Sequence, residues 1–73
     1  MDNFNFKLIL KNRVHVFRAE KRITQQQLAD EIGVTRGTII AIEKGNYNPS
    51  LELAFRLSKY FNVDIHSLFQ IKE

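Results

Sequence analysis

Residues 24–45 read TQQQLADEIGVTRGTIIAIEKG, and they carry the start and stop signals of two short helices joined by a tight turn. Thr24 is an N-cap residue, and the glutamine three residues later completes a capping box. Gly33 suits the left-handed backbone that often ends a helix, and Thr35 caps the next one. We therefore predict helices at about residues 25–32 and 36–44.

The second of these helices has two different faces. At about 100° per residue, Ile39 and Ile42 point toward a core. The opposite side carries Arg36, Gly37, Ile40, Ala41 and Lys44. An exposed face with small residues at its centre and a cation at each end can approach a polyanion closely, so the pattern favours a groove-reading helix.

This block resembles the helix-turn-helix of the lambda-repressor and Cro-like (XRE-type) regulators of bacteria and phages. The pattern TQxxLAxxIGVTxxTIxxIExG matches that motif at nearly every framework position, and the resemblance extends over about residues 11–69. It implies a mainly α fold, a compact five-helix lambda-repressor-like domain of the short single-domain subgroup. Residues 1–73 are then one helix-turn-helix DNA-binding domain.

Three further helices are expected around the motif. The first spans about residues 12–20, and a last short one, capped by Asp64, spans residues 65–68. Between them Ser50 caps a fourth helix. We expect the main core set to be Leu51, Leu53, Ala54, Phe55, Leu57 and Phe61.

Both ends of the chain alternate in the period of a strand, at about residues 5–10 and 69–72. They can pair as a small two-stranded antiparallel ribbon, as in some short members of the family that the chain resembles; the alternative is frayed tails. Apolar residues near these ends are the candidates for a dimer interface, namely Phe6, Leu8, Ile65, Leu68, Phe69 and Ile71.

Composition and charge bound the class of protein. The chain has 73 residues, 44% of them hydrophobic, with no cysteine, which predicts one small folded domain without disulfides. No apolar run is long enough for a membrane span and no signal peptide is evident, so we expect a cytoplasmic protein with no membrane partner. The net charge is only +3, but residues 7–44 carry eight Lys or Arg against four acids. That cluster suits phosphate contact, although an ordinary solvated surface would look the same.

The resemblance implies the roles of individual residues on double-stranded DNA. Arg36 is the expected guanine reader, with phosphate contact alone as the alternative, and Tyr47 either touches phosphate or packs over the core edge. Arg18 and Glu43 match a structural salt bridge of the family. The expected base-reading set is Arg36, Gly37, Thr38, Ile40 and Ala41, and the expected phosphate set is Thr24, Gln25, Thr35, Lys44, Asn46, Tyr47 and Asn48. Gly37 and Ala41 offer no hydrogen bond, so direct readout should be sparse and lean on DNA shape.

No residue pattern points to catalysis, a metal, another cofactor or a small-molecule ligand. His15 and His66 are isolated from any ligand-spaced set, and no nucleophile–base pair is evident. We expect no enzyme but a homodimeric transcriptional repressor that binds an inverted-repeat operator, with half-sites spaced by about 10 bp or a multiple. The alternative is a protein-interaction module, such as an antitoxin or an adaptor with the same fold.

Overall fold

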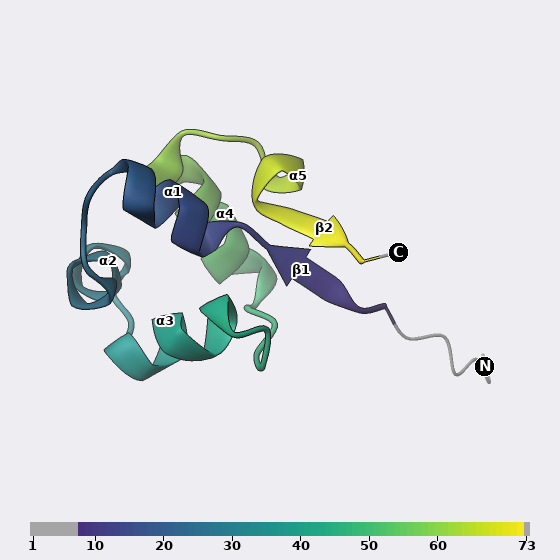
Figure 1. Ribbon diagram of the computed structural model, residues 1–73, viewed down its shortest axis with the longest axis horizontal. Helices are drawn as coiled ribbons and strands as arrows, with labels where there is room; N and C mark the ends of the chain where they lie inside the picture. The colour runs from purple at the N-terminus through teal and green to yellow at the C-terminus, as the bar shows by residue number, and fades with distance from the viewer. Residues whose placement is uncertain (1–7, 73) are drawn as a thin grey trace.

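Helix caps set where most elements of this chain begin. The computed structural model describes residues 8–72, in the order β1 (Leu10–Asn12), α1 (Val14–Glu20), α2 (Gln25–Ile32), α3 (Arg36–Glu43), α4 (Leu51–Phe61), α5 (Ile65–Leu68) and β2 (Phe69–Ile71) (Figure 1). At the starts of α2 to α5, a side-chain oxygen accepts a hydrogen bond from the backbone N–H three residues later. The caps are those predicted, Thr24, Thr35, Ser50 and Asp64. The mainly α, five-helix architecture is confirmed.

The first helix starts two residues later than predicted. Asn12 ends β1 instead of opening α1, and its Oδ1 accepts a hydrogen bond from the Val14 N–H at 3.1 Å. The Arg13 N–H donates a hydrogen bond to the carbonyl of Leu68, the last residue of α5, at 2.9 Å. The Asn12 contact is local, but the Arg13 contact depends on the returning end of the chain, which no local helix signal reveals.

The two ends of the described chain pair as the expected antiparallel ribbon. Leu10 lies opposite Ile71, Lys11 opposite Gln70 and Asn12 opposite Phe69. The predicted N-terminal strand at residues 5–10 was misplaced, because Leu8 and Ile9 are not in a strand and β1 runs from Leu10 to Asn12. Residues 1–7, Phe6 among them, lie outside the described residues. The position of β1 is set by its partner, because strand hydrogen bonds form only where β2 lies alongside. β2 begins at Phe69, immediately after α5 ends.

The core lies between the helices and includes one face of α4. Leu53, Leu57 and Phe61 are buried there at helical spacing. Leu51 and Phe55 were wrongly expected to join them: they lie about 160° and 200° around the helix from Leu53, and they are 73% and 53% exposed. The other buried apolar residues are Val14, Leu28, Ala29, Ile32, Ile39, Ile42, Ala54 and Leu68.

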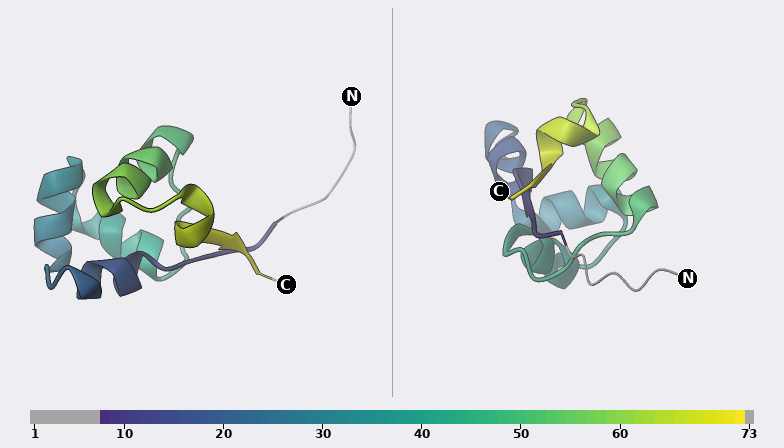
Figure 2. Two further views of the ribbon diagram at one scale, coloured as in Figure 1. Left: turned by 90° about the horizontal axis from the view of Figure 1, so that it is seen from above. Right: turned by 90° about the vertical axis from the view of Figure 1, so that its right-hand side faces the viewer.

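The ribbon and α2 lie at opposite ends of the molecule. The ribbon projects from one end of the helical bundle, with α2 at the other, as two further views show (Figure 2). Along one side of the bundle α3 lies at the surface, and the C-terminal part of α4 lies on the opposite side (Figure 1). This arrangement leaves α3 accessible along its length and places its C-terminal end toward the ribbon.

Candidate nucleic-acid interface

The turn between α2 and α3 has the geometry that its sequence predicts. Gly33 ends α2 in the left-handed region, with φ 86°. The N–H groups of Gly33 and Val34 both donate to the Ala29 carbonyl, at 2.8 and 3.0 Å. Val34 is half-buried and packs against the core. The turn therefore fixes how α3 leaves α2.

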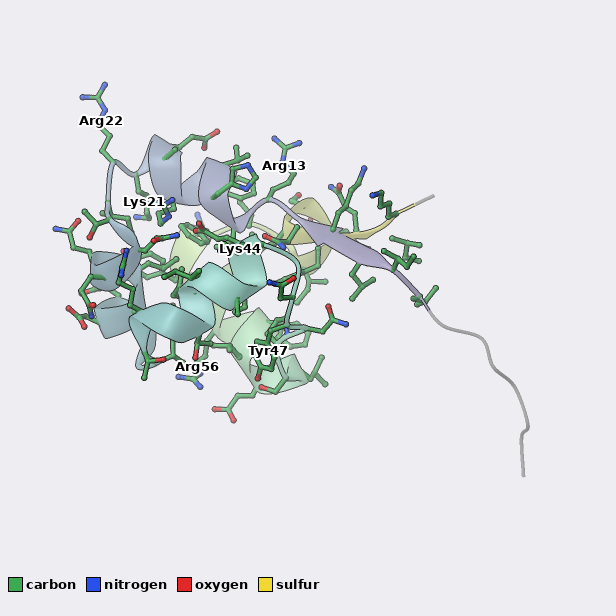
Figure 3. The ribbon with its side chains drawn as sticks, turned by 60° about the horizontal axis from the view of Figure 1, so that its bottom comes forward. Arg13, Lys21, Arg22, Lys44, Tyr47 and Arg56 are labelled. Atoms are coloured by element: carbon green, nitrogen blue, oxygen red, sulfur yellow. The ribbon has the colours of Figure 1, made fainter. Side chains whose placement is uncertain are left out.

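The rotation of α3 agrees with the sequence. Ile39 and Ile42 are fully buried, whereas Arg36 and Gly37 at the start of the helix are exposed. Ile40 and Ala41 are only partly exposed, so the middle of the outer face is more covered than its start. Thr38 is partly exposed, and its hydroxyl lies 3.1 Å from that of Thr35. Figure 3 shows this side of α3 facing the viewer, with Lys44 at its end and Tyr47 in the loop that follows.

A hydrogen-bonded network centred on the Glu43 carboxylate holds α3 in place. Arg18 Nε and Nη2 donate to its two oxygens, at 2.8 and 3.2 Å, which is the pair expected from the sequence. Arg18 Nη1 also donates to the Ile23 carbonyl at 3.0 Å. The hydrogen bond that Arg18 donates to Glu43 raises the pKa of the Arg18 guanidinium above its ordinary value. The network joins α1, the loop before α2 and the end of α3.

Gln25 takes part in the same network. Its Nε2 donates to Glu43 Oε1 at 3.1 Å, so the amide is oriented before any ligand arrives. An amide nitrogen carries two hydrogens, which leaves a second donor for a phosphate near the first turn of α2. Sequence reasoning placed Gln25 at the DNA backbone but missed its contact with Glu43.

Most other expected phosphate contacts lie at the surface, but the two threonines also have a structural role. Thr24 and Thr35 accept N–H groups as helix caps through their hydroxyls. Lys44, Asn46, Tyr47 and Asn48 are exposed in one segment after α3. The Tyr47 side chain is 45% exposed and is absent from the cluster that packs against the core, which favours the phosphate alternative over packing.

Two residues that position α3 and α2 went unrecognised in the sequence. Asn12 Nδ2 donates to the Ile42 carbonyl at 2.8 Å and so ties β1 to the end of α3. Arg56 Nη1 donates to the Ile32 carbonyl at 2.5 Å, at the end of α2. The partners are 30 and 24 residues apart, so only the tertiary arrangement brings them together.

The expected dimer residues do not form one exposed set. Leu68 was a wrong assignment, because its side chain is fully buried at the end of α5. Leu8 and Ile71 are 45% and 51% exposed, and Ile65 and Phe69 are half-buried. Ile65 and Phe69 also line a mainly apolar groove, whose other lining residues are Leu10, Asn48, Pro49, Leu51 and Ala54.

Neither a metal site nor a membrane span is found within residues 8–72. No group of three His, Cys, Asp or Glu side chains in this part of the chain could hold a metal ion. None of its helices is both long and apolar enough to cross a membrane.

Two packed helices joined by a glycine turn, with the outer face of the second helix exposed at its start, define a helix-turn-helix DNA-binding protein. The chain belongs to the HTH_3 helix-turn-helix family, whose model matches residues 16–68. It is 52% identical over 60 residues to an HTH-type transcriptional regulator of Methanocaldococcus jannaschii, covering 82% of this chain and 91% of that one.

Two further similarities extend over most of the chain. The phage transcriptional repressor RstR of Vibrio cholerae is 32% identical, over 89% of this chain and 59% of RstR. The restriction-modification controller protein C.AhdI of Aeromonas hydrophila superposes with a TM-score of 0.68 at 25% identity, over 75% and 80% of the two chains. The protein is thus a DNA-binding transcriptional regulator and not an enzyme.

Proposed function

We propose that this protein is a cytoplasmic homodimeric repressor that places α3 in the major groove of an inverted-repeat operator. The observation that carries the proposal is the exposed start of α3. Arg36 and Gly37 lie there, directly after the turn at Gly33 that ends α2. The similarity to RstR, a transcriptional repressor, supports the negative sign of regulation.

Base reading is proposed to rest chiefly on Arg36. It is the first residue of α3 and exposed, and a guanidinium can make two hydrogen bonds to a guanine edge. Ile40 and Ala41 would add only apolar contacts, to thymine methyl groups, and the Thr38 hydroxyl is already close to Thr35. With so few donors on α3, DNA shape and deformability must supply part of the specificity.

Phosphate contacts are proposed on both sides of α3. Gln25, Thr24 and Thr35 lie near the starts of α2 and α3, where backbone N–H groups and the helix dipole favour an anion. Lys44 and the exposed segment through Asn48 would contact the backbone beyond the other end of α3. Such contacts set register and affinity and carry no sequence information directly.

The test is a footprint on the DNA upstream of the protein's own coding region, followed by binding measurements over a range of salt concentrations. Arg36→Ala should relax specificity at one base position per half-site and weaken specific binding by about 1 to 3 kcal/mol, whereas Lys44→Ala should weaken all sequences and lower the salt slope by about one. Lys59→Ala is the matched control, because Lys59 is exposed and belongs to the C-terminal part of α4, which lies on the side of the bundle opposite α3 (Figure 1).

The result also separates DNA binding from the protein-interaction alternative. Absence of salt-dependent DNA binding at low ionic strength would overturn the proposal and favour an antitoxin or adaptor. The sign of regulation needs a second readout: expression from the footprinted promoter should rise when the gene is deleted, and a fall would indicate an activator.

A further inference from the structure

A group of three lysines, distinct from Arg36 at the start of α3, lies where the ribbon meets the end of α3. A pocket of about 310 Å³ there is lined by Lys11 of β1, Lys44 and Gly45 after α3, and Lys72 after β2. We refer to it as the lysine pocket. Its lysines come from three segments that are remote in sequence, so neither the charge pattern nor the helix-turn-helix motif predicts it.

The register of the ribbon accounts for two of these lysines. Lys11 lies opposite Gln70, and the Lys72 N–H donates to the Ile9 carbonyl at 2.7 Å, which continues the same ladder. Side chains alternate between the two faces of a strand, so Lys11 and Lys72 share one face of the ribbon. A shift of the register by one residue would separate them.

The charge of the lysine pocket is not balanced within the part of the chain that is described. Glu43 is the one carboxylate among its lining residues. Its side chain is 9% exposed and already accepts hydrogen bonds from Arg18 and Gln25. Between residues 8 and 72, no carboxylate forms an ion pair with Lys11, Lys44 or Lys72.

We propose that Lys11 and Lys72 of the ribbon extend the phosphate contact of Lys44, so that the lysine pocket binds a backbone phosphate of the DNA. Lys44 stands at the C-terminal end of α3, where the partial negative charge of the helix offsets part of its own charge. Lys11 and Lys72 of the ribbon supply the excess positive charge that attracts an anion. The ribbon then makes direct contact with DNA in addition to joining the two ends of the fold.

This inference rests on the proposed function, because the phosphate belongs to the same operator. It predicts that the Lys11→Gln/Lys72→Gln double variant lowers the salt slope of DNA binding by about one per half-site, because one phosphate contact is lost, and that each single variant lowers it by less. The double variant should lower affinity at least tenfold at low salt, equally for operator and unrelated DNA. In a phosphate-ethylation interference experiment, one phosphate per half-site whose ethylation blocks binding of the wild type should no longer do so for the variant.

Matched controls separate the failure of this inference from failure of the proposed function. Lys59→Gln removes the same charge far from the pocket and should leave the slope unchanged. If wild-type protein binds DNA but the Lys11→Gln/Lys72→Gln variant keeps the full salt slope and every interfering phosphate, only the lysine pocket is refuted. If the wild type fails to bind DNA, both proposals fall.

Inorganic phosphate distinguishes a DNA contact from a free-anion site. In an NMR titration of the unbound protein, phosphate should shift the amide signals of Lys11 and Gly45 weakly, and operator DNA should shift them at far lower concentration. Saturable phosphate binding together with unaltered DNA binding by the double variant would overturn the assignment to DNA.

Discussion

Two glycines of the helix-turn-helix have opposite conformational requirements. Gly33 adopts φ 86°, and a Cβ built there would lie 3.5 Å from Arg56 Nη1. We expect Gly33→Ala to lower the free energy of unfolding by about 1 kcal/mol, because a residue with a Cβ is strained in the left-handed region. Urea denaturation of the two proteins, followed by far-ultraviolet circular dichroism, measures the difference.

Gly37→Ala is the matched control for that substitution. Gly37 lies inside α3 without a positive φ, and a Cβ there would meet only Thr35 Oγ1 at 3.8 Å. Helix propensity alone then applies, so this variant should be more stable by roughly 0.5 kcal/mol. Equal losses from the two substitutions would contradict the assignment of strain to Gly33.

At the scale of the element, α5 depends on a cap that titrates. Asp64 Oδ1 accepts the Ser67 N–H at 2.9 Å, and this hydrogen bond lowers the pKa of Asp64 below its ordinary value. A carboxyl whose pKa is lower in the folded state stabilises the fold above its unfolded pKa. That contribution is lost as the pH falls through the folded pKa.

We therefore expect Asp64→Asn to flatten the acid limb of the stability profile. Wild-type stability should fall more steeply than that of Asp64→Asn between about pH 5 and pH 2, because asparagine can cap α5 without titrating. Thermal melts across that range give the two profiles. Glu31→Gln controls for the loss of one carboxylate, since Glu31 is exposed and no hydrogen bond to its side chain occurs within residues 8–72.

Features determined by a few neighbouring residues were predictable, and features that need a distant partner were not. The caps of α2 to α5 and the left-handed Gly33 could be predicted because their physical causes lie within three or four residues. The end of β1 and the Asn12 contact with Ile42 depend on chain segments far away in sequence. For the same reason the lysine pocket could not be predicted from the charges alone.

The errors in the core and the dimer set have a different cause. Apolar character alone did not reveal which side of a short helix faces inward. Leu51 and Phe55 are as apolar as Leu57, yet they lie on the outer side of α4. Leu68 was expected at the surface but is buried at the end of α5. Burial depends on how neighbouring helices cross, which helical periodicity does not determine.

At the scale of the whole molecule, most exposed aliphatic and phenyl side chains of residues 8–72 lie on or beside the ribbon or on α4. Leu8, Ile9 and Ile71 are near the ribbon, whereas Leu51 and Phe55 are on α4. Ile71 lines a pocket with Ile65 and Phe69, the residues that remain from the expected dimer set. A domain of this size gains stability by covering such a surface, and a second copy would cover it symmetrically.

If the protein dimerises through the ribbon and α5, one pair of variants can show it. Ile71→Lys should convert the protein to a monomer in sedimentation equilibrium, because a lysine would bury its charge in an apolar interface. Its affinity for a full inverted repeat should fall by roughly 100-fold or more, while its affinity for one half-site stays unchanged, since only the linkage between half-sites is lost. Phe55→Lys is the control, because Phe55 is 53% exposed against 51% for Ile71. Dissociation caused by Phe55→Lys but not by Ile71→Lys would move the interface to the outer face of α4.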